Sequence, residues 1–378
     1  MATDGHPKRK ELAKRDVEQW QGSMEILVNC NFWKNRKVAV TGHTGFKGSW
    51  LSFWLNELQA EVHGFAQIPQ TNPSLFDELE LKSSVCHRIG DIENFDAVKE
   101  WLNLAQPEVI FHLAAQPLVI SSYEAPLQTW QSNVLGTLNL LEAIRIRERP
   151  CAVVIVTTDK VYENRNEQYD YRETDRLGGH DPYSSSKAAV ELSVASWRAS
   201  FFKADTGIRV ATARAGNVIG GGDWSEDRIV PDLVRALSEK RPIGVRNPNA
   251  IRPWQHVLEP LCGYLNLAEK LFLDENAASQ SSFNFGPESS DCRSVRDLVE
   301  CSLRHWQGSW KDESRHAGPL EAQILSLSID KARDKLGWRP RWNFETSVEQ
   351  TITWYLDVME NQRSPNAVCR EQLLSFQT

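Results

Sequence analysis

The chain has 378 residues and a formal net charge of −7, with seven cysteines. This length accommodates one large α/β domain with a smaller companion, and the acidic balance argues against nucleic acid as a partner. The cysteines form no CxxC pair and no stretch approaches the roughly 20 apolar residues of a membrane span, so we expect no metal site and no membrane association.

The first 30 residues are predicted to be a polar extension to which we assign no function. Positive and negative charges are mixed through it, without the apolar core of a secretory signal. The cysteines of the chain are scattered and odd in number, which favours a reducing compartment. We therefore expect a cytoplasmic protein.

From Lys37 onward, short β-branched runs alternate with longer segments of helical spacing, such as Trp50–Leu58 and Val134–Leu141. The expected strands are Val38–Val40, Glu61–Phe65, Val109–Leu113, Val153–Thr157 and Arg209–Ala213. Such alternation is typical of successive βαβ units. The sequence therefore predicts an α/β fold, a Rossmann-type doubly wound parallel sheet.

After Gly216 the character of the sequence changes. Loops rich in Gly, Pro, Arg and Trp are interrupted by helical segments at Pro231–Ser238 and Glu259–Leu273. We expect a main domain over residues 31–216 and a smaller, mostly C-terminal lobe over residues 217–378. A segment starting at Phe283 can add one more strand to the main sheet.

A glycine-rich turn follows the first expected strand. Gly42, Gly45 and Gly48 stand directly between that strand and an amphipathic helix. A tight turn needs a residue without Cβ, a diphosphate must approach the backbone closely, and the following helix offers unpaired N–H groups. This context predicts a dinucleotide site. The GxxGxxG spacing resembles that of the extended short-chain dehydrogenase/reductase family.

The second expected strand ends without the acid that usually binds the adenosine ribose. It also lacks an arginine for a 2′-phosphate, so NAD is favoured over NADP. Asp91 resembles the adenine-contacting acid of the family, although a turn or helix-cap aspartate is the alternative. The resemblance implies an NAD site made of Gly42, Thr44, Gly45, Phe46, Lys47, Gly48, Asp91, Ile92, Ala114, Ala115, Asn133, Tyr183 and Lys187.

Tyr183 and Lys187 open a predicted helix just after Pro182. A spacing of four residues places both side chains on one helical face, where the lysine charge favours the tyrosinate and lowers the pKa of the phenol. A YxxxK pair alone is common on exposed helices. In a chain that also carries the glycine turn upstream, the pair indicates a base for a sugar hydroxyl.

Thr158, Asp159 and Lys160 follow the strand ending at Thr157, where an open α/β sheet places its ligands. A polar turn is the plain alternative. The triplet resembles that of the nucleotide-sugar 4,6-dehydratases. In the thymidine-linked members, Asp-Glu follows the threonine, whereas Asp159-Lys160 is similar to the cytidine-linked members. The likeness covers nearly everything from about Phe32 to Tyr355.

This resemblance implies that CDP-D-glucose is converted to CDP-4-keto-6-deoxy-D-glucose, with NAD regenerated in each turnover. Tyr183 would take the C4 hydroxyl proton while Thr158 orients the oxygen. Asp159 would donate a proton to the departing C6 hydroxyl. Lys160 would act at C5, as a base if neutral or by stabilising the enolate. Lys187 would donate to the nicotinamide ribose.

Recognition of the nucleoside diphosphate is expected from the smaller lobe, because guanidinium groups match phosphate oxygens. Trp224 either flanks the base or sugar or fills a core, as does Trp254. His256 is expected to be structural. The predicted substrate-binding residues are Gln116, Asn217, Arg228, Arg252 and Trp254.

Two alternatives stay open at this point. An epimerase, or a dehydratase acting on a dTDP-, GDP- or UDP-linked sugar, would keep the glycine turn and the Tyr183–Lys187 pair. A non-catalytic NAD-binding module would use the same fold for regulation. Members of the family usually pair through helices that correspond to Asn133–Ile146 and Tyr183–Phe202, so a homodimer or homotetramer is implied.

Overall fold

The computed structural model describes residues 28–274, 279–314 and 324–378. The predicted N-terminal extension lies outside the described residues except for its last three positions. No helix among the described residues is long and apolar enough to cross a membrane.

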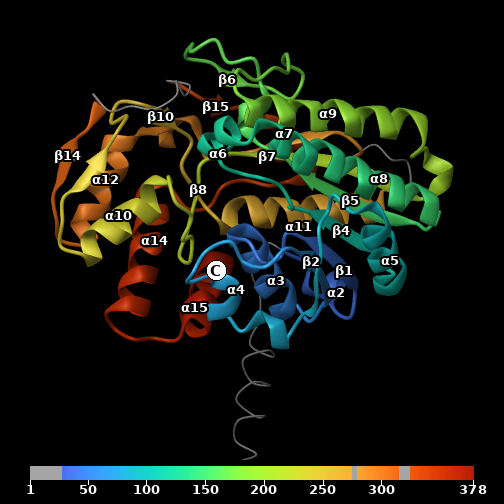
Figure 1. Ribbon diagram of the computed structural model, residues 1–378, viewed down its shortest axis with the longest axis horizontal. Coiled ribbons are helices and arrows are strands. Elements are labelled where there is room, and N and C mark those ends of the chain that lie inside the picture. Colours follow the sequence, from blue (N-terminus) through green and yellow to red (C-terminus); the bar gives the residue numbers. More distant parts are fainter. Residues whose placement is uncertain (1–27, 275–278, 315–323) are drawn as a thin grey trace, which may run out of the picture.

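A seven-stranded parallel sheet forms the centre of the molecule (Figure 1). In sheet order, its strands are β12 (Ser282–Phe285), β7 (Ile208–Ala215), β5 (Cys151–Val156), β4 (Val109–His112), β1 (Lys37–Thr41), β2 (Glu61–Ala66) and β3 (Cys86–Ile89). The chain builds outward from β1 to β3 and then starts again at β4 on the other side of β1. This order is that of a Rossmann-type doubly wound sheet and confirms the predicted fold class.

Helices cover both faces of the sheet, and both faces are apolar. The helices on one face are α5 (Phe95–Ala105), α8 (Gly136–Arg147) and α9 (Pro182–Ser200), and those on the other are α3 (Phe46–Glu57) and α11 (Leu258–Leu273). All six side chains of β5 are buried, as expected for a strand with helices on both sides. The central strands are therefore held rigidly, and their carboxyl ends can position a site.

The remaining elements surround this core. The other helices are α2 (Cys30–Trp33), α4 (Leu75–Glu78), α6 (Val119–Glu124), α7 (Pro126–Trp130), α10 (Ile229–Ser238), α12 (Val295–His305), α13 (Asp330–Leu336), α14 (Phe344–Met359) and α15 (Pro365–Gln377). The short turns are the π-helical η2 (Gln131–Leu135) and the 3-10 turns η1 (Leu81–Ser83), η3 (Asp159–Val161), η4 (Ala204–Thr206) and η5 (Ser289–Asp291).

Within the described ranges, four two-stranded sheets lie outside the main sheet. They pair β10 (Ile251–Arg252) with β13 (Arg293–Ser294), β11 (Gln255–His256) with β8 (Val218–Ile219), β14 (Trp310–Asp312) with β9 (Ile243–Val245), and β15 (Ser326–Leu327) with β6 (Asp170–Tyr171). Figure 1 shows α10, α12, β9 and β14 grouped at one end of the molecule, beside the main sheet.

The five expected strands all exist, with ends that differ by up to two residues. The sequence reading missed β3, an edge strand without a run of buried side chains. The segment at Phe283 does return to the main sheet, as β12 beside β7. The helix α11, which also follows Gly216 in the chain, packs on that sheet as well.

Candidate active site

A cleft of about 1100 Å³ opens at the carboxyl ends of the main strands. It extends from the turn after β1 and the end of β4, where the strand order reverses, to the loops between β7 and β10. Open α/β sheets place ligands at this reversal point. Every predicted catalytic and substrate-binding residue lines the cleft, and so does every predicted cofactor residue except Asn133.

The glycine turn leaves no room for side chains at two of its positions. Gly42 has a φ of +73°, and a Cβ on it would lie 2.7 Å from the backbone nitrogen of Ala114. A Cβ on Gly48 would lie 2.1 Å from the carbonyl oxygen of Gly42. Gly45 is the N-cap residue of α3 and faces the cleft, so the first N–H groups of this helix are available to an anion.

Asp91 and Gln67 form a hydrogen-bonded pair at the edge of the cleft beside β2 and β3. The Gln67 side-chain amide donates to one Asp91 carboxylate oxygen at 2.8 Å, and the other oxygen accepts the N–H of Glu93 at 2.9 Å. The Thr44 hydroxyl donates to the Gln67 carbonyl at 2.9 Å. Asp91 therefore closes a turn and also faces the cleft, so the two roles weighed for it are compatible.

Asn133 does not reach the cleft. It is fully buried, its amide oxygen accepts the N–H of Gln116 at 2.8 Å, and its amide nitrogen donates to the Ser186 hydroxyl at 2.8 Å and to the Gln116 carbonyl. No polar atom of its side chain is left for a ligand. The expected contact with the cofactor is replaced by a positioning role, because Asn133 ties the segment after β4 to α9.

Thr158 and Asp159 lie where β5 ends, and both are buried. The Thr158 hydroxyl donates to Oδ1 of Asp159 at 3.0 Å and caps the turn η3 by accepting the N–H of Lys160. Oδ2 of Asp159 is buried, and no described residue donates a hydrogen bond to it. Asp159 nevertheless lines the cleft, where a reacting group would lie.

Tyr183 and Lys187 are held by the first two turns of α9. Asp181 caps this helix by accepting the N–H of Ser184 at 2.8 Å, and Pro182 occupies its first position. Thr158 is near enough to the Tyr183 phenol to lower its pKa, so the pair and the triplet adjoin in the cleft. Lys187 donates to the Val156 carbonyl at 3.3 Å.

The electrostatics of the phenol differ from the expectation. Burial raises the pKa of Tyr183 to about 12, Asp159 adds to this rise, and the nearby cation that lowers the pKa is Arg228 rather than Lys187. Burial also lowers the pKa of Lys187 to about 8, against the charge of Glu191. In the protein without ligands, Tyr183 is therefore a neutral phenol at pH 7, because burial outweighs the helical neighbour.

Two further lysines line the cleft near Asp159. Lys160 is half-buried at the start of η3, and no hydrogen bond of its ammonium is found among the described residues. Burial lowers the pKa of Lys47 to about 7, and the charges of Arg228 and Lys187 add to this effect while Asp159 opposes it. Lys47 therefore extends from the glycine turn into the field of the catalytic groups.

The opposite wall of the cleft carries the predicted substrate residues. Asn217 has a φ of +45°, and its amide oxygen is buried without a donor among the described residues. Arg228 donates to Asp223 at 3.0 Å. Arg252 is buried and donates to the Ile251 carbonyl at 2.9 Å.

The side chains of Trp254, Trp224 and Gln116 already have hydrogen-bond partners. The Trp254 indole donates to the Arg293 carbonyl at 3.0 Å, and the Trp224 indole donates to Glu78 at 3.1 Å, yet both line the cleft. The Gln116 amide donates to Thr129 at 2.9 Å. His256 is fully buried beside Trp50 and Trp342 and does not line the cleft, which agrees with a structural role.

Sequence reasoning missed three residues of the site. Gln67 stands where an acid was sought, Asp223 holds Arg228, and Gly216 makes room for Asp159, because a Cβ on it would lie 1.8 Å from Oδ2. Gly216 and Asp223 both fall in the part of the chain that the family resemblance covers, so the resemblance carried a signal for them. The contact of Gln67 with Asp91 depends on the pairing of β2 with β3, and β3 was not predicted.

This arrangement suits proton transfer at a hydroxyl beside a dinucleotide. A phenol, a hydroxyl and a carboxylate meet at the end of β5, lysines surround them, and the glycine turn faces them. Titratable groups whose pKa values are shifted by burial and by neighbouring charges are typical of general acid–base sites.

Comparison with known proteins gives consistent matches. The family described as GDP-mannose 4,6 dehydratase matches residues 39–351. A CDP-glucose 4,6-dehydratase of Salmonella typhimurium is 44% identical over 336 residues, which cover 87% of this chain and 93% of that protein. A dTDP-glucose 4,6-dehydratase of Xanthomonas campestris is 28% identical over 290 residues, which cover 71% of this chain and 78% of that protein.

Solved structures share the fold at lower identity. A dTDP-glucose 4,6-dehydratase of Bacillus anthracis in complex with NAD has a TM-score of 0.70 at 19% identity, covering 86% of this chain and 98% of that one. A UDP-glucose 4-epimerase of Thermotoga maritima with UDP-glucose has a TM-score of 0.73 at 19% identity, covering 85% and 99%. At these identities the likeness shows the fold alone.

Proposed function

The chain belongs to the nucleotide-sugar 4,6-dehydratase family, and we propose that it converts CDP-D-glucose to CDP-4-keto-6-deoxy-D-glucose and water with NAD as its cofactor. The observation that carries this proposal is the triplet Thr158-Asp159-Lys160 at the end of β5, which lines the same cleft as Tyr183. The 44% identity to a CDP-glucose 4,6-dehydratase supports the cytidine-linked substrate. An epimerase has no need of the Asp159-Lys160 step.

The cleft fits NAD at the positions that any dinucleotide must use. Gly42 and Gly48 let the turn pack tightly, and Gly45 caps α3 at the cleft, so the first N–H groups of this helix can bind a diphosphate. Asp91 faces the same cleft at the adenosine end. When bound there, NAD supplies the acceptor and later the donor of the hydride. The chain's own residues then handle the protons.

Tyr183 removes the proton of the C4 hydroxyl, whose oxygen the Thr158 hydroxyl orients. The phenol must ionise before it can accept this proton, and Arg228 is the neighbouring cation whose charge lowers its pKa. Once C4 is a ketone, the C5 proton becomes acidic. Asp159, which lines the cleft, is the acid that we assign to the departing C6 hydroxyl.

Lys160 is assigned to C5, where a proton must be removed after C4 is oxidised. We expect Lys160→Ala to abolish the exchange of the C5 hydrogen with deuterated solvent, measured by NMR on recovered sugar nucleotide. Lys99→Ala, which removes an exposed lysine of α5, serves as the matched control and should exchange normally. Normal exchange in Lys160→Ala would exclude this role.

Product analysis tests the function as a whole. Purified protein incubated with CDP-glucose and NAD should give the alkali-induced absorbance of a 4-keto sugar, and mass spectrometry should show the loss of one water. Comparable turnover of dTDP-, GDP- and UDP-glucose would contradict the cytidine assignment. Formation of a 4-epimer, or no turnover of any sugar nucleotide, would favour the epimerase and the non-catalytic reading respectively.

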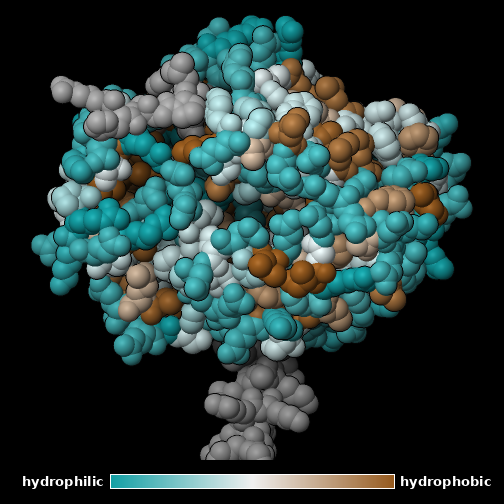
Figure 2. All heavy atoms as spheres, viewed as in Figure 1, coloured by the Kyte–Doolittle hydropathy of each residue, from teal (hydrophilic) through white to brown (hydrophobic). Residues whose placement is uncertain are grey.

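We also propose a homodimer or a tetramer built from dimers, in the cytoplasm. Exposed apolar side chains gather over α7, α8 and α9 (Figure 2). They include Leu127, Trp130, Leu135, Ile146, Leu192 and Phe201. A contiguous apolar patch on a protein surface supports an interface. All seven cysteines are free, which supports a reducing compartment.

A further inference from the structure

An ion pair between Glu191 and Arg214 is buried beneath the active site. Glu191 comes from α9 and Arg214 from β7, their charged groups are 2.8 Å apart, and their side chains are 2% and 3% exposed. Burying two charges costs several kcal/mol per ion before their attraction is counted, so a pair of this kind is weak evidence of stability by itself. Its position beneath the active site suggests that the pair orients catalytic residues.

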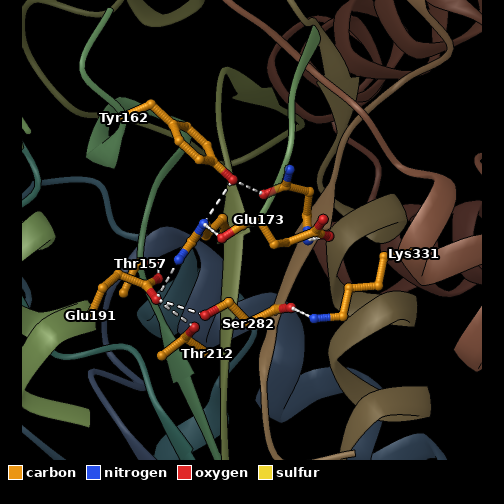
Figure 3. Close-up of polar contacts among 9 residues, drawn as sticks. Thr157, Tyr162, Glu173, Glu191, Thr212, Ser282 and Lys331 are labelled. Atoms are coloured by element: carbon orange, nitrogen blue, oxygen red, sulfur yellow. Dashed lines mark hydrogen bonds and ion pairs between the residues drawn. The ribbon is translucent and has the colours of Figure 1, made fainter. Parts of the chain in front are cut away.

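The two partners hold the catalytic triplet at both of its ends. Glu191 accepts the hydroxyl of Thr157 at 2.6 Å, immediately before the triplet. Arg214 donates to the phenol oxygen of Tyr162 at 2.8 Å, two residues after the triplet, and lies 5.0 Å from that ring. Figure 3 shows Thr157 and Tyr162 on opposite sides of this cluster. Residues 158–160 therefore lie between Thr157, which Glu191 holds, and Tyr162, which Arg214 holds.

The same carboxylate belongs to the helix that carries the other catalytic groups. Glu191 lies one turn after Lys187 and two turns after Tyr183 on α9. The charge of Glu191 also opposes the effect of burial on the pKa of Lys187. One rigid helix thus presents the phenol and the ammonium to the cleft, and it presents the carboxylate to the strand that carries the triplet.

Glu191 has two further hydroxyl partners that lie away from the triplet. It accepts from Thr212 of β7 at 2.7 Å and from Ser282 of β12 at 3.0 Å. Although burial alone would raise the pKa of Glu191, Arg214 and the hydroxyl donors Thr157 and Thr212 hold it below its ordinary value. The carboxylate therefore stays charged and keeps its ties to β5, β7 and β12 at once.

We propose that Glu191 and Arg214 are positioning residues that fix the Thr158–Lys160 segment against Tyr183 and Lys187. This inference rests on the proposed function. Neither residue lines the cleft, so both act through the residues that they hold. The reacting groups must be placed within fractions of an ångström, and a misplacement of about 1 Å costs on the order of 100-fold in rate.

Two threonines provide a matched test. Thr157 and Thr212 both donate buried hydroxyl bonds to Glu191, at 2.6 and 2.7 Å, yet only Thr157 adjoins the triplet. A purely structural role for the ion pair predicts equal effects of Thr157→Val and Thr212→Val. A positioning role predicts that Thr157→Val lowers kcat for CDP-glucose by about tenfold or more with KM within about twofold, while Thr212→Val keeps kcat within about twofold.

Three controls make the outcome decisive. Thr157→Ser keeps the hydroxyl and should restore kcat. Thermal unfolding of both valine variants should show similar losses, because each removes one hydrogen bond to the same carboxylate. Hydrogen exchange followed by mass spectrometry should show faster exchange of the amides of residues 158–162 in Thr157→Val and not in Thr212→Val.

Failure of this proposal is distinguishable from failure of the proposed function. If the unmodified protein does not turn over CDP-glucose, the function is wrong, and hydrogen exchange alone decides whether the segment is held through Thr157. If the unmodified protein is active and the two valine variants have equal kcat, or if their exchange over residues 158–162 is equal, the positioning role is overturned.

Discussion

At the scale of single residues, Gly216 has no room for a side chain, because Asp159 fills the space where its Cβ would lie. Gly216 follows β7, and its missing side chain is what allows the Asp159 carboxylate to sit at the end of β5. A Cβ there would lie 1.8 Å from Oδ2 and 2.3 Å from Oδ1. The carboxylate therefore has to move if residue 216 acquires any side chain.

Gly216→Ala is expected to lower kcat for CDP-glucose by about 100-fold, because the added methyl group displaces the carboxylate that we assign to the departing C6 hydroxyl. Steady-state kinetics measure the loss, and the thermal midpoint reports any cost to the fold. Gly178→Ala is the matched control, since its Cβ would meet no atom nearer than 3.5 Å. Equal kcat in the two variants would show that Asp159 tolerates displacement.

The residues that touch the cleft were largely predictable, because chemistry fixes their type and spacing. Tyr183 and Lys187 share a helical face, and Thr158 to Lys160 follow a strand, so short patterns reveal them. Asn133 was misassigned because its buried amide is spent on Gln116 and Ser186, a fact that only the packing of α9 decides. The pKa of Tyr183 was misjudged for a related reason, since burial is not visible in a spacing of four residues.

At the scale of elements, α11 is tied to the C-terminal helices through one carboxylate. Glu259 lies in the first turn of α11 and is fully buried. One of its oxygens accepts the N–H groups of Arg341 at 3.0 Å and Trp342 at 2.7 Å, just before α14, while no described residue donates to the other. Burial raises the pKa of Glu259 to about 7, and the two backbone donors oppose this rise.

Glu259 therefore predicts how stability depends on pH. Its pKa is higher in the folded protein than in the unfolded chain, so its contribution is fully present below about pH 4 and is lost as the pH rises to about 7. This loss amounts to roughly 3 kcal/mol. Glu259→Gln cannot ionise, so its stability relative to the unmodified protein should improve between pH 4.5 and 7. Urea unfolding at several pH values measures the free energy of unfolding of both proteins. A difference between them that does not change with pH would contradict the prediction.

The elements themselves were predicted unevenly. Strands buried on both faces, such as β5, appear as unbroken apolar runs, and their existence was clear from the sequence. The edge strand β3 has half-exposed side chains and shows no such run. The return of β12 was suspected, but its partner is β7, about 70 residues earlier in the chain, and no local pattern encodes that pairing.

At the scale of the whole molecule, the apolar surface over α7, α8 and α9 is the feature that leads beyond a single chain. Leu127 is 79% exposed and Leu192 is 62% exposed. A second copy related by a twofold axis would cover this surface with the same surface of its own, which is the commonest arrangement in homodimers. The proposed dimer therefore makes a direct prediction about assembly.

Leu192→Glu is expected to convert the dimer to a monomer, because it would bury two carboxylates in the interface. Size-exclusion chromatography with light scattering measures the mass. Leu273→Glu is the matched control: Leu273 is 60% exposed at the end of α11, which covers the other face of the sheet, and its replacement should leave the dimer intact. A mass unchanged by Leu192→Glu would place the contact elsewhere.

The pairing of β12 with β7 also determines when the main sheet can be completed during synthesis. When the ribosome has made residues up to Gly216, six strands can assemble, but β7 still presents an open edge of unpaired backbone groups. That edge is closed only after β12 has emerged, following α11. During this interval the exposed edge of β7 can pair with other chains and promote aggregation. Synthesis of β12 removes this risk by covering the edge.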